Sequence, residues 1–361
     1  MPPLSSKLNA SINEYETLPD TYRRLVAKHT GESFRDVATV VKENMFNPAH
    51  LEDDERIVRV LYAGVNGGCE TFRCREGCGV VVAGPASAEA STGSSYDEAS
   101  TLPVGSHVMF VGGAFSEYVK VKTSQCHLIK MSSKEMTALR ISGHVAYAAL
   151  THVGHMKKDN VVLVTAAAGA TGSFAVQFAK DCGCHVVATC RNSDKADILQ
   201  SRYGVDRVIN YSLENIEDVL RSKYGGLIDI AYEGVGGTMQ ALAWENLAPG
   251  GRLLSVGYIS QYPHAHSGPV QSFSDSLPRP DELFWKGQTV VDDSKTAFGN
   301  VWPTDASVRQ QALEQVCNLY AEGRVTPLID DVRQFHGIES IPDAIDYMLL
   351  GNAIGKVVVS L

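Results

Sequence analysis

Residues 160–190 constrain the fold of this chain more than any other stretch. They open with a short apolar run, Val161–Thr165, whose β-branched residues are typical of a strand buried on both faces. A turn of small residues follows at Ala166–Gly172, then apolar residues at helical spacing over Ser173–Cys182, then a second buried strand at His185–Cys190. Such a strand–helix–strand unit predicts a parallel sheet with a right-handed crossover.

The turn between the first strand and the helix carries a dinucleotide-binding pattern. It reads Ala167-x-Gly169-x-x-Gly172, the G-x-G-x-x-G fingerprint with alanine in place of the first glycine. Gly169 would let the backbone approach a pyrophosphate, and the N–H groups at the helix start would hold its oxygens. A tight turn with no ligand is the alternative. The predicted cofactor-binding residues of the turn are Ala167, Ala168, Gly169, Ala170, Thr171 and Gly172.

The residues after the second strand indicate which dinucleotide is preferred. An NAD site usually has Asp or Glu near the end of this strand, whereas here the chain continues as Arg191-Asn192-Ser193-Asp194-Lys195. Arg191, Ser193 and Lys195 could surround a 2′-phosphate, with Asp194 as a helix cap. The pattern therefore favours NADPH over NADH, although Lys195 taken alone could be a solvated lysine in a first helical turn.

Composition limits the partners of the chain. Its 361 residues allow about two domains, and a net charge of −9 argues against a nucleic acid or an anionic membrane, which leaves a small molecule as the expected partner. No apolar run is long enough for a membrane span, and Met1–Tyr22 has acidic residues and no apolar core, unlike a signal or transit peptide. Eight cysteines then suggest reduced thiols and a cytoplasmic location.

The order of elements predicts two domains. Short strands separated by Gly- and Ser-rich turns continue to His127–Lys130 and indicate a β-rich domain, while strands alternate with helices from Asn160 onward. The stretch from Pro263 to about Asp293 is interpreted as a loop, and the last strand, Lys356–Ser360, is expected to return to the β-rich domain. We therefore expect an α/β fold in which a Rossmann-type doubly wound parallel sheet, residues 130–295, is inserted into a β domain formed by residues 1–129 and 296–361.

Several motifs in order along the chain resemble one protein family. They are Ala63-Gly64-Val65-Asn66, Gly113–Tyr118, the turn Ala166–Gly172, Ile209-Asn210-Tyr211, Tyr232–Gly237, Gly257–Tyr262 and Gly355–Val358. Together they resemble the zinc-free branch of the medium-chain dehydrogenase/reductases, the quinone oxidoreductase and prostaglandin reductase group. The resemblance implies a GroES-like β-barrel catalytic domain, a Rossmann domain, a cleft between them and a homodimer. It also implies that NADPH donates a hydride to the activated C=C bond of an enone, such as a 15-oxo-prostaglandin, or to a quinone.

The resemblance also implies roles for single residues. Lys195 and Tyr211 would bind the 2′-phosphate, with Arg191 and Ser193 as helpers, and Gly257, Ile259, Tyr262 and Asn300 would complete the cofactor site. Two residues are predicted to be catalytic. Tyr262 would lie beside the nicotinamide ribose and meet the negative charge that develops on the substrate carbonyl oxygen. The alternative for Tyr262 is a loop tyrosine that covers the cofactor without taking part in the chemistry. Asn66 matches the asparagine that faces the cleft.

A zinc site is not expected. Cys69, Cys74 and Cys78 lie close together, but their spacing is irregular and neither a fourth cysteine nor a nearby histidine accompanies them. In zinc-dependent relatives a Gly-His-Glu triplet supplies a ligand, and the aligned residues here are Arg75-Glu76-Gly77. We therefore predict no metal.

Three departures from the family pattern keep alternatives open. The segment Gly67–Arg75, which should form one wall of the cleft, is shortened, and Asn352 is shifted by one place within Gly351–Lys356. Val145 stands where the family has a threonine that bonds the nicotinamide amide; the adjacent His144 is either a substitute donor or a packed residue. An enone reductase, a quinone reductase and a non-catalytic NADPH-binding protein are therefore the hypotheses to be tested.

Overall fold

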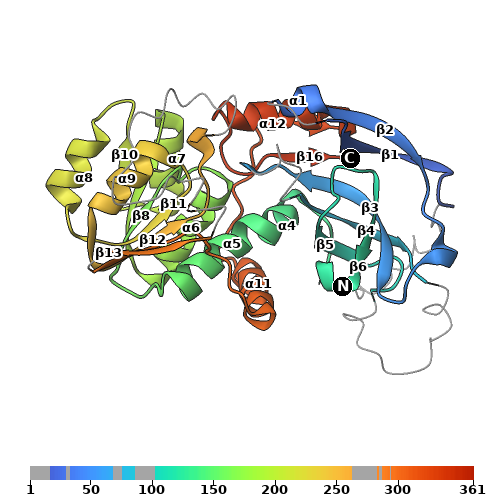
Figure 1. Cartoon of the computed structure of the whole chain (residues 1–361), viewed down its shortest axis with the longest axis horizontal. Coiled ribbons are helices and arrows are strands. Elements are labelled where there is room, and N and C mark those ends of the chain that lie inside the picture. Colours follow the sequence, from blue (N-terminus) through green and yellow to red (C-terminus); the bar gives the residue numbers. More distant parts are fainter. Residues whose placement is uncertain are drawn as a thin grey trace, which may run out of the picture.

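The computed structural model describes residues 17–29, 33–67, 75–85, 102–261, 283, 287–292 and 294–361. Its described part contains two seven-stranded sheets and one two-stranded sheet. Figure 1 shows the two larger sheets side by side, with helices α5 (His144–Ala148) and α11 (Ala306–Ala321) between them. Within the described residues, no helix combines the length and apolar character that a membrane span requires.

The first large sheet is the Rossmann-type sheet that the sequence predicts. Its strand order is β10-β9-β8-β11-β12-β14-β13, and all neighbours are parallel except β13 and β14. The strands are β8 (Val161–Val164), β9 (His185–Cys190), β10 (Arg207–Asn210), β11 (Ile228–Glu233), β12 (Leu247–Ser255), β13 (Thr289–Asp292) and β14 (Lys295–Phe298). The chain order reverses between β8 and β11, which is where sheets of this kind bind ligands beyond the carboxyl ends of their strands.

In the described part of the chain, the helices that connect these strands are α6 (Ala170–Cys182), α7 (Ser193–Tyr203), α8 (Ile216–Tyr224) and α9 (Gly237–Glu245). Helix α6 begins three residues before the predicted start, because Gly169 is its N-cap and the glycine-rich turn passes directly into the helix. The prediction that Asp194 caps α7 was wrong. The cap is Asn192, whose side-chain oxygen accepts a hydrogen bond from the Lys195 N–H at 3.0 Å, a bond typical of an N-cap asparagine.

The second large sheet has the order β15-β16-β3-β4-β5-β7, with β6 pairing with β3. Its strands are β3 (Glu55–Gly64), β4 (Glu76–Ala83), β5 (His107–Val111), β6 (Tyr118–Lys122), β7 (Cys126–Ile129), β15 (Phe335–His336) and β16 (Val358–Ser360). The last strand, β16, pairs antiparallel with β3, which confirms the predicted return of the chain. In Figure 1 the red C-terminal elements accordingly lie among the blue N-terminal strands.

The remaining elements pack around the two sheets. Strands β1 (Thr21–Ala27) and β2 (Ala38–Asn44) form a hairpin-like pair, and a helical stretch made of α4 (Lys134–Ala138), α5 and two π-helical turns, Leu139–Gly143 and Ala149–Val153, links the sheets. Among the described residues, the other helices are α1 (Phe34–Val37), α12 (Ile341–Leu349) and the 3₁₀ turns Pro48–His50, Thr123–Gln125, Ile259–Gln261 and Ile338–Ser340.

Separate hydrophobic cores support the two large sheets. Val162, Val164 and Phe174 pack together between the Rossmann sheet and α6, while Val58 and Val359 lie in the core of the second sheet. Each buried aliphatic or aromatic side chain of this kind contributes about 1.5–3 kcal/mol. We propose the two-domain division predicted from the sequence, with one adjustment: the predicted boundary at 295/296 falls inside β14, so the Rossmann sheet continues to Phe298.

Two strands were not predicted from the sequence. The stretch after β1 is polar and shows no strand pattern, yet Ala38–Asn44 forms β2, paired from Ala27↔Ala38 to Thr21↔Asn44. The stretch interpreted as a loop up to about Asp293 contains β13, which is held by its antiparallel pairing with β14. Both strands depend on a partner strand, and their own sequence patterns are too weak to predict them.

Candidate active site

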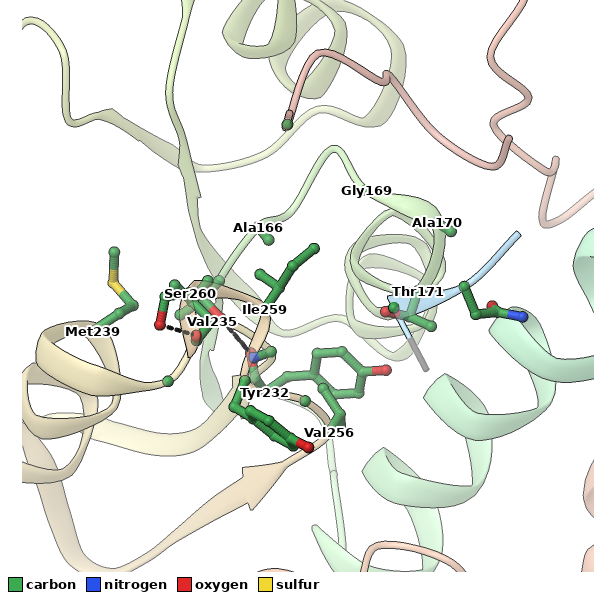
Figure 2. Close-up of a pocket in the computed structure, with 18 of the residues that line it drawn as sticks. Ala166, Gly169, Ala170, Thr171, Tyr232, Val235, Met239, Val256, Ile259 and Ser260 are labelled. Carbon is green, nitrogen blue, oxygen red and sulfur yellow. Dashed lines mark hydrogen bonds between the residues drawn. The ribbon is translucent and has the colours of Figure 1, made fainter. Parts of the chain in front are cut away.

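A cleft with a volume of about 970 Å³ lies at the carboxyl ends of β8, β9, β11 and β12. One side is formed by the turn before α6 and by the ends of these strands. The other side is formed by residues 65–67 of the second domain and by its residues Met348, Leu349, Leu350, Gly351, Ala353, Gly355 and Val357. Figure 2 shows the turn from Ala166 to Gly169 leading to Ala170 and Thr171 at the start of α6. The size suits a dinucleotide together with a small substrate.

The glycine-rich turn has the geometry that its sequence predicts. Ala166 has a positive φ of 46°, and the Gly169 N–H donates to the Ala166 carbonyl at 2.9 Å, which closes the turn. A Cβ on Gly172 would lie 2.5 Å from the Ala166 carbonyl oxygen, so this position requires glycine. Ala168, Gly169, Ala170 and Thr171 line the cleft; Ala167 is buried, and Gly172 packs behind the lining residues. The N-terminus of α6 therefore faces the cleft.

The cations predicted for the 2′-phosphate lie at the end of β9. Arg191, Lys195 and Tyr211 line the cleft, whereas Ser193 does not and is exposed at the start of α7. The Arg191 guanidinium donates to the Leu350 carbonyl at 2.9 Å, and Lys195 Nζ donates to the Gly351 carbonyl at 2.7 Å. Burial, and then the charge of Arg191, lower the pKa of Lys195. Both cations are thus in contact with the second domain at the rim of the cleft.

A buried carboxylate that sequence analysis did not single out holds the loop after β11. Glu233 is fully buried and accepts hydrogen bonds from the Val235 N–H at 2.7 Å, the Gly236 N–H at 3.0 Å and the Thr165 hydroxyl at 3.1 Å. Burial raises the pKa of Glu233 to about 7, and these donors oppose the shift. Glu233 lies in the Tyr232–Gly237 motif. Nothing in the sequence around it indicates, however, that its carboxylate is buried and holds this loop.

The loops after β11 and β12 form one wall of the cleft together. The Ile259 N–H donates to the Gly234 carbonyl at 3.3 Å, and the Ser260 hydroxyl donates to the Val235 carbonyl at 2.6 Å. Figure 2 shows Val235, Ile259 and Ser260 side by side in this wall. Gly257 and Ile259 both line the cleft, as predicted for cofactor-binding residues. A Cβ on Gly257 would be 3.3 Å from the Gly234 carbonyl oxygen, so a side chain there would push the two loops apart.

Asn66 lines the cleft and belongs to a buried polar cluster. Its side-chain oxygen accepts a hydrogen bond from Lys356 Nζ at 2.6 Å, and its Nδ2 donates to the Glu76 carboxylate. Lys356 and Glu76 also form a salt bridge and have no exposed side-chain surface. Sequence analysis found Asn66 but not its partners, which are separated from it by 10 and 290 residues.

The remaining residues named in the sequence analysis are Asn300, Val145, His144 and Tyr262. Asn300 lines the cleft, and its side-chain oxygen accepts from the Trp302 N–H at 3.0 Å. Val145 lines the cleft, but His144 is packed, with Nε2 donating to the Arg309 carbonyl at 2.7 Å and its ring 4.6 Å from that of Trp302. Tyr262 lies outside the described residues.

The cysteines near β4 are only partly described. Cys78 is buried, and its thiol donates to the Ser133 carbonyl at 3.1 Å; Cys69 and Cys74 lie outside the described residues. In the part of the chain with described coordinates, no three His, Cys, Asp or Glu side chains are grouped so that they could hold a metal ion.

Comparisons with known proteins agree with this architecture. A family model described as "Zinc-binding dehydrogenase" matches residues 170–277, which begin at the first residue of α6. Prostaglandin reductase-3 of Mus musculus is 34% identical, over 95% of this chain and 90% of that relative. A probable quinone oxidoreductase of Leishmania amazonensis is 30% identical, over 95% of this chain and 99% of that relative. The crystal structure of CurA in complex with NADPH from Vibrio vulnificus has a TM-score of 0.70, with 20% identity, and covers 94% of this chain and 98% of that chain.

The fold, together with the two relatives that match nearly the whole chain, places the protein in the medium-chain dehydrogenase/reductase class of oxidoreductases. Within that class, the chain belongs to the zinc-free quinone oxidoreductase and prostaglandin reductase group. Both relatives match nearly the whole chain, so the membership includes the second domain as well as the Rossmann domain.

Proposed function

We propose that the protein is an NADPH-dependent reductase of the activated C=C bond of α,β-unsaturated ketones. One observation carries the proposal: a single cleft joins the glycine-rich turn, the cations Arg191 and Lys195, and the amide of Asn66. Oxidoreductases of this class need a nucleotide and a substrate side by side, and the cleft offers groups suited to each.

The residues of the cleft fit NADPH. The N-terminus of α6 offers N–H groups to a pyrophosphate, and the absence of a side chain at Gly169 keeps the backbone accessible there, while Gly172 lets the turn pack closely against α6. Arg191, Lys195 and Tyr211 would hold the 2′-phosphate, and none of the described residues that line the cleft near them is a carboxylate that would repel it. When bound, NADPH supplies the hydride for the reduction.

The side chains of the cleft would orient the substrate and stabilise charge. The apolar residues Val65, Ile141, Val145 and Val256 line the cleft and would exclude water from an apolar substrate. Reduction of an enone leaves negative charge on the carbonyl oxygen, which must be met by fixed donors. The amide of Asn66 and, as the sequence predicts, the hydroxyl of Tyr262 are the donors we propose for this role.

We propose a long-chain enone, such as a 15-oxo-prostaglandin, as the substrate class. The apolar residues Met239, Met348 and Leu349 line the cleft as well, so an extended alkyl chain would find apolar contacts. A relative named prostaglandin reductase-3 that aligns with 95% of this chain supports this choice.

The homodimer implied by the family also remains our prediction, and light scattering of the purified protein tests it.

A quinone is the second candidate substrate class, because a relative named probable quinone oxidoreductase aligns along 95% of the chain. Quinone reduction also requires hydride transfer to an electron-poor carbonyl compound. It needs no proton donor placed at a particular carbon, so a less enclosed cleft would suffice.

The test is NADPH consumption across simple enones, 15-oxo-prostaglandins and quinones, with product identification by mass spectrometry. We expect saturated ketones as products from enones and little turnover with NADH. Turnover of quinones alone would favour the second candidate. Tight NADPH binding without turnover of any acceptor would overturn both and indicate a non-catalytic nucleotide-binding protein.

A further inference from the structure

Glu76 and Lys356 form an ion pair with no exposed side-chain surface, at the boundary between the second domain and the cleft. Glu76 is the first residue of β4, and Lys356 precedes the last strand of the chain, β16. Removing two charges from water costs several kcal/mol per ion, and their attraction offsets this cost only with good geometry and further hydrogen bonds. A pair of this kind is therefore weak evidence of stability and calls for another explanation.

The further hydrogen bonds of the pair go to one residue, Asn66. Lys356 donates to its side-chain oxygen at 2.6 Å, and Glu76 accepts from its Nδ2. An asparagine side chain can turn over and exchange its donor and acceptor ends, since the two ends have nearly the same shape. A cation on one end and a carboxylate on the other permit only one orientation. The pair therefore decides which atom of Asn66 is the donor.

The neighbouring glycines leave room for this arrangement. A Cβ on Gly64 would lie 2.5 Å from a Glu76 carboxylate oxygen and 3.0 Å from Lys356 Cε, so the pair occupies the space of a side chain at that position. Gly355 has a φ of +86°, and a Cβ on it would lie 2.2 Å from the Leu328 carbonyl oxygen. Both glycines belong to motifs found in the sequence. The ion pair explains why position 64 has no side chain.

The backbone next to Lys356 touches the cofactor turn. The Gly355 N–H donates to the Ala168 carbonyl at 2.7 Å, and Gly355 forms a parallel bridge with Gly169. The Lys356 N–H in turn donates to the Leu328 carbonyl at 2.7 Å. Lys356 therefore has a fixed position relative to the turn, and through Lys356 so does the amide of Asn66.

We propose that Glu76 and Lys356 are positioning residues that hold the Asn66 amide in one orientation toward the substrate in the cleft. This inference rests on the proposed function, in which Asn66 faces the substrate. The Lys356 cation also polarises the amide through its oxygen, which makes the Asn66 N–H that points away from Glu76 a better donor to a developing oxyanion. The ion pair thus acts on the reaction through Asn66 and has no contact of its own with the substrate.

A double-mutant cycle tests the proposal. Asn66→Ala should lower kcat for the best enone substrate about tenfold or more, with the KM for NADPH little changed, as expected when an oriented donor is lost. The neutral double variant Glu76→Gln/Lys356→Met leaves no buried charge unpaired and should lower kcat to a similar extent. Adding Asn66→Ala to that variant should then have less than about a twofold further effect, because both changes remove the same interaction. Additive effects, or a normal kcat in the double variant, would overturn the proposal.

Two measurements keep the test independent of folding and of turnover. If the double variant fails to fold, Gly64→Ala replaces it, since the added methyl displaces the Glu76 carboxylate while both charges remain. The side-chain amide signal of Asn66 in ¹⁵N NMR spectra is assigned by its loss in Asn66→Ala. Its hydrogen exchange should be slow in the wild-type protein and fast in the double variant or in Gly64→Ala. Equal exchange in both proteins would refute the positioning role even for an inactive enzyme. Absence of enone turnover in the wild-type protein would refute only the proposed function.

Discussion

Lys195 Nζ lies 2.7 Å from the carbonyl oxygen of Gly351, just beyond the C-terminus of α12. The guanidinium of Arg191 makes the equivalent contact with the Leu350 carbonyl at 2.9 Å. The carbonyl end of a helix carries a partial negative charge, so it suits two cations. The residues expected to recognise the 2′-phosphate of NADPH are therefore also contacts between the two domains.

Replacing Lys195 should change cofactor preference. Lys195→Ala removes a charged donor from the cleft, and a hydrogen bond to a charged group contributes about 1.5–3 kcal/mol. We expect the Kd for NADPH to rise about tenfold to a hundredfold, with little change for NADH, as measured by fluorescence titration. Lys223→Ala, an exposed position near the end of α8, is the matched control. Parallel losses for both cofactors would contradict the assignment of Lys195 to the 2′-phosphate.

Gly172→Ala should damage the cofactor turn. The new methyl group would lie 2.5 Å from the Ala166 carbonyl oxygen and 2.9 Å from Ala167 Cα, and both neighbours are backbone atoms that cannot move aside cheaply. We expect a lower Tm and weak NADPH binding. Gly84→Ala is the control, because its nearest neighbour, Arg56 Cδ, is 3.4 Å away. Unchanged NADPH binding in Gly172→Ala would show that the turn does not hold the cofactor.

The buried Glu233 should make stability depend on pH. Burial raises its pKa from 4.5 to about 7, so between these values the folded protein binds more protons than the unfolded chain. The stabilisation is complete below the unfolded pKa and is lost as pH rises through the folded pKa. We expect the free energy of unfolding to fall by roughly 3 kcal/mol across this range, and Glu233→Gln to remove that part of the slope. Chemical denaturation at several pH values measures it, and identical slopes in both proteins would contradict the prediction.

Chelators should leave the activity intact. The sequence predicts no zinc site, and the proposed reduction needs only the cofactor and fixed hydrogen-bond donors. Dialysis against EDTA should therefore change neither kcat nor Tm, and elemental analysis should find no stoichiometric metal. Loss of activity that added zinc restores would contradict this prediction and would implicate the cysteines near β4.

Local sequence determined the nucleotide-binding half of the site. The strand His185–Cys190 has the bounds that its pattern predicts, and the turn leads from β8 into α6 as expected. These features follow from short-range rules: β-branched residues favour strands, and a position such as Gly172 tolerates only glycine. Arg191 and Lys195 follow β9 within a few residues, so their place in the cleft could also be predicted.

The tertiary structure decided the other half of the site, the one proposed to face the substrate. The polar cluster joins Asn66, Glu76 and Lys356 from both ends of the chain, and no periodicity within a short window relates these positions. Glu233 likewise became an anchor for the loop after β11 only through burial and through the hydroxyl of Thr165, the residue that follows the neighbouring strand β8. Local patterns encode which element a residue joins. The partners of a buried charge depend on how separate elements pack, because desolvation and hydrogen bonding are properties of the assembled fold.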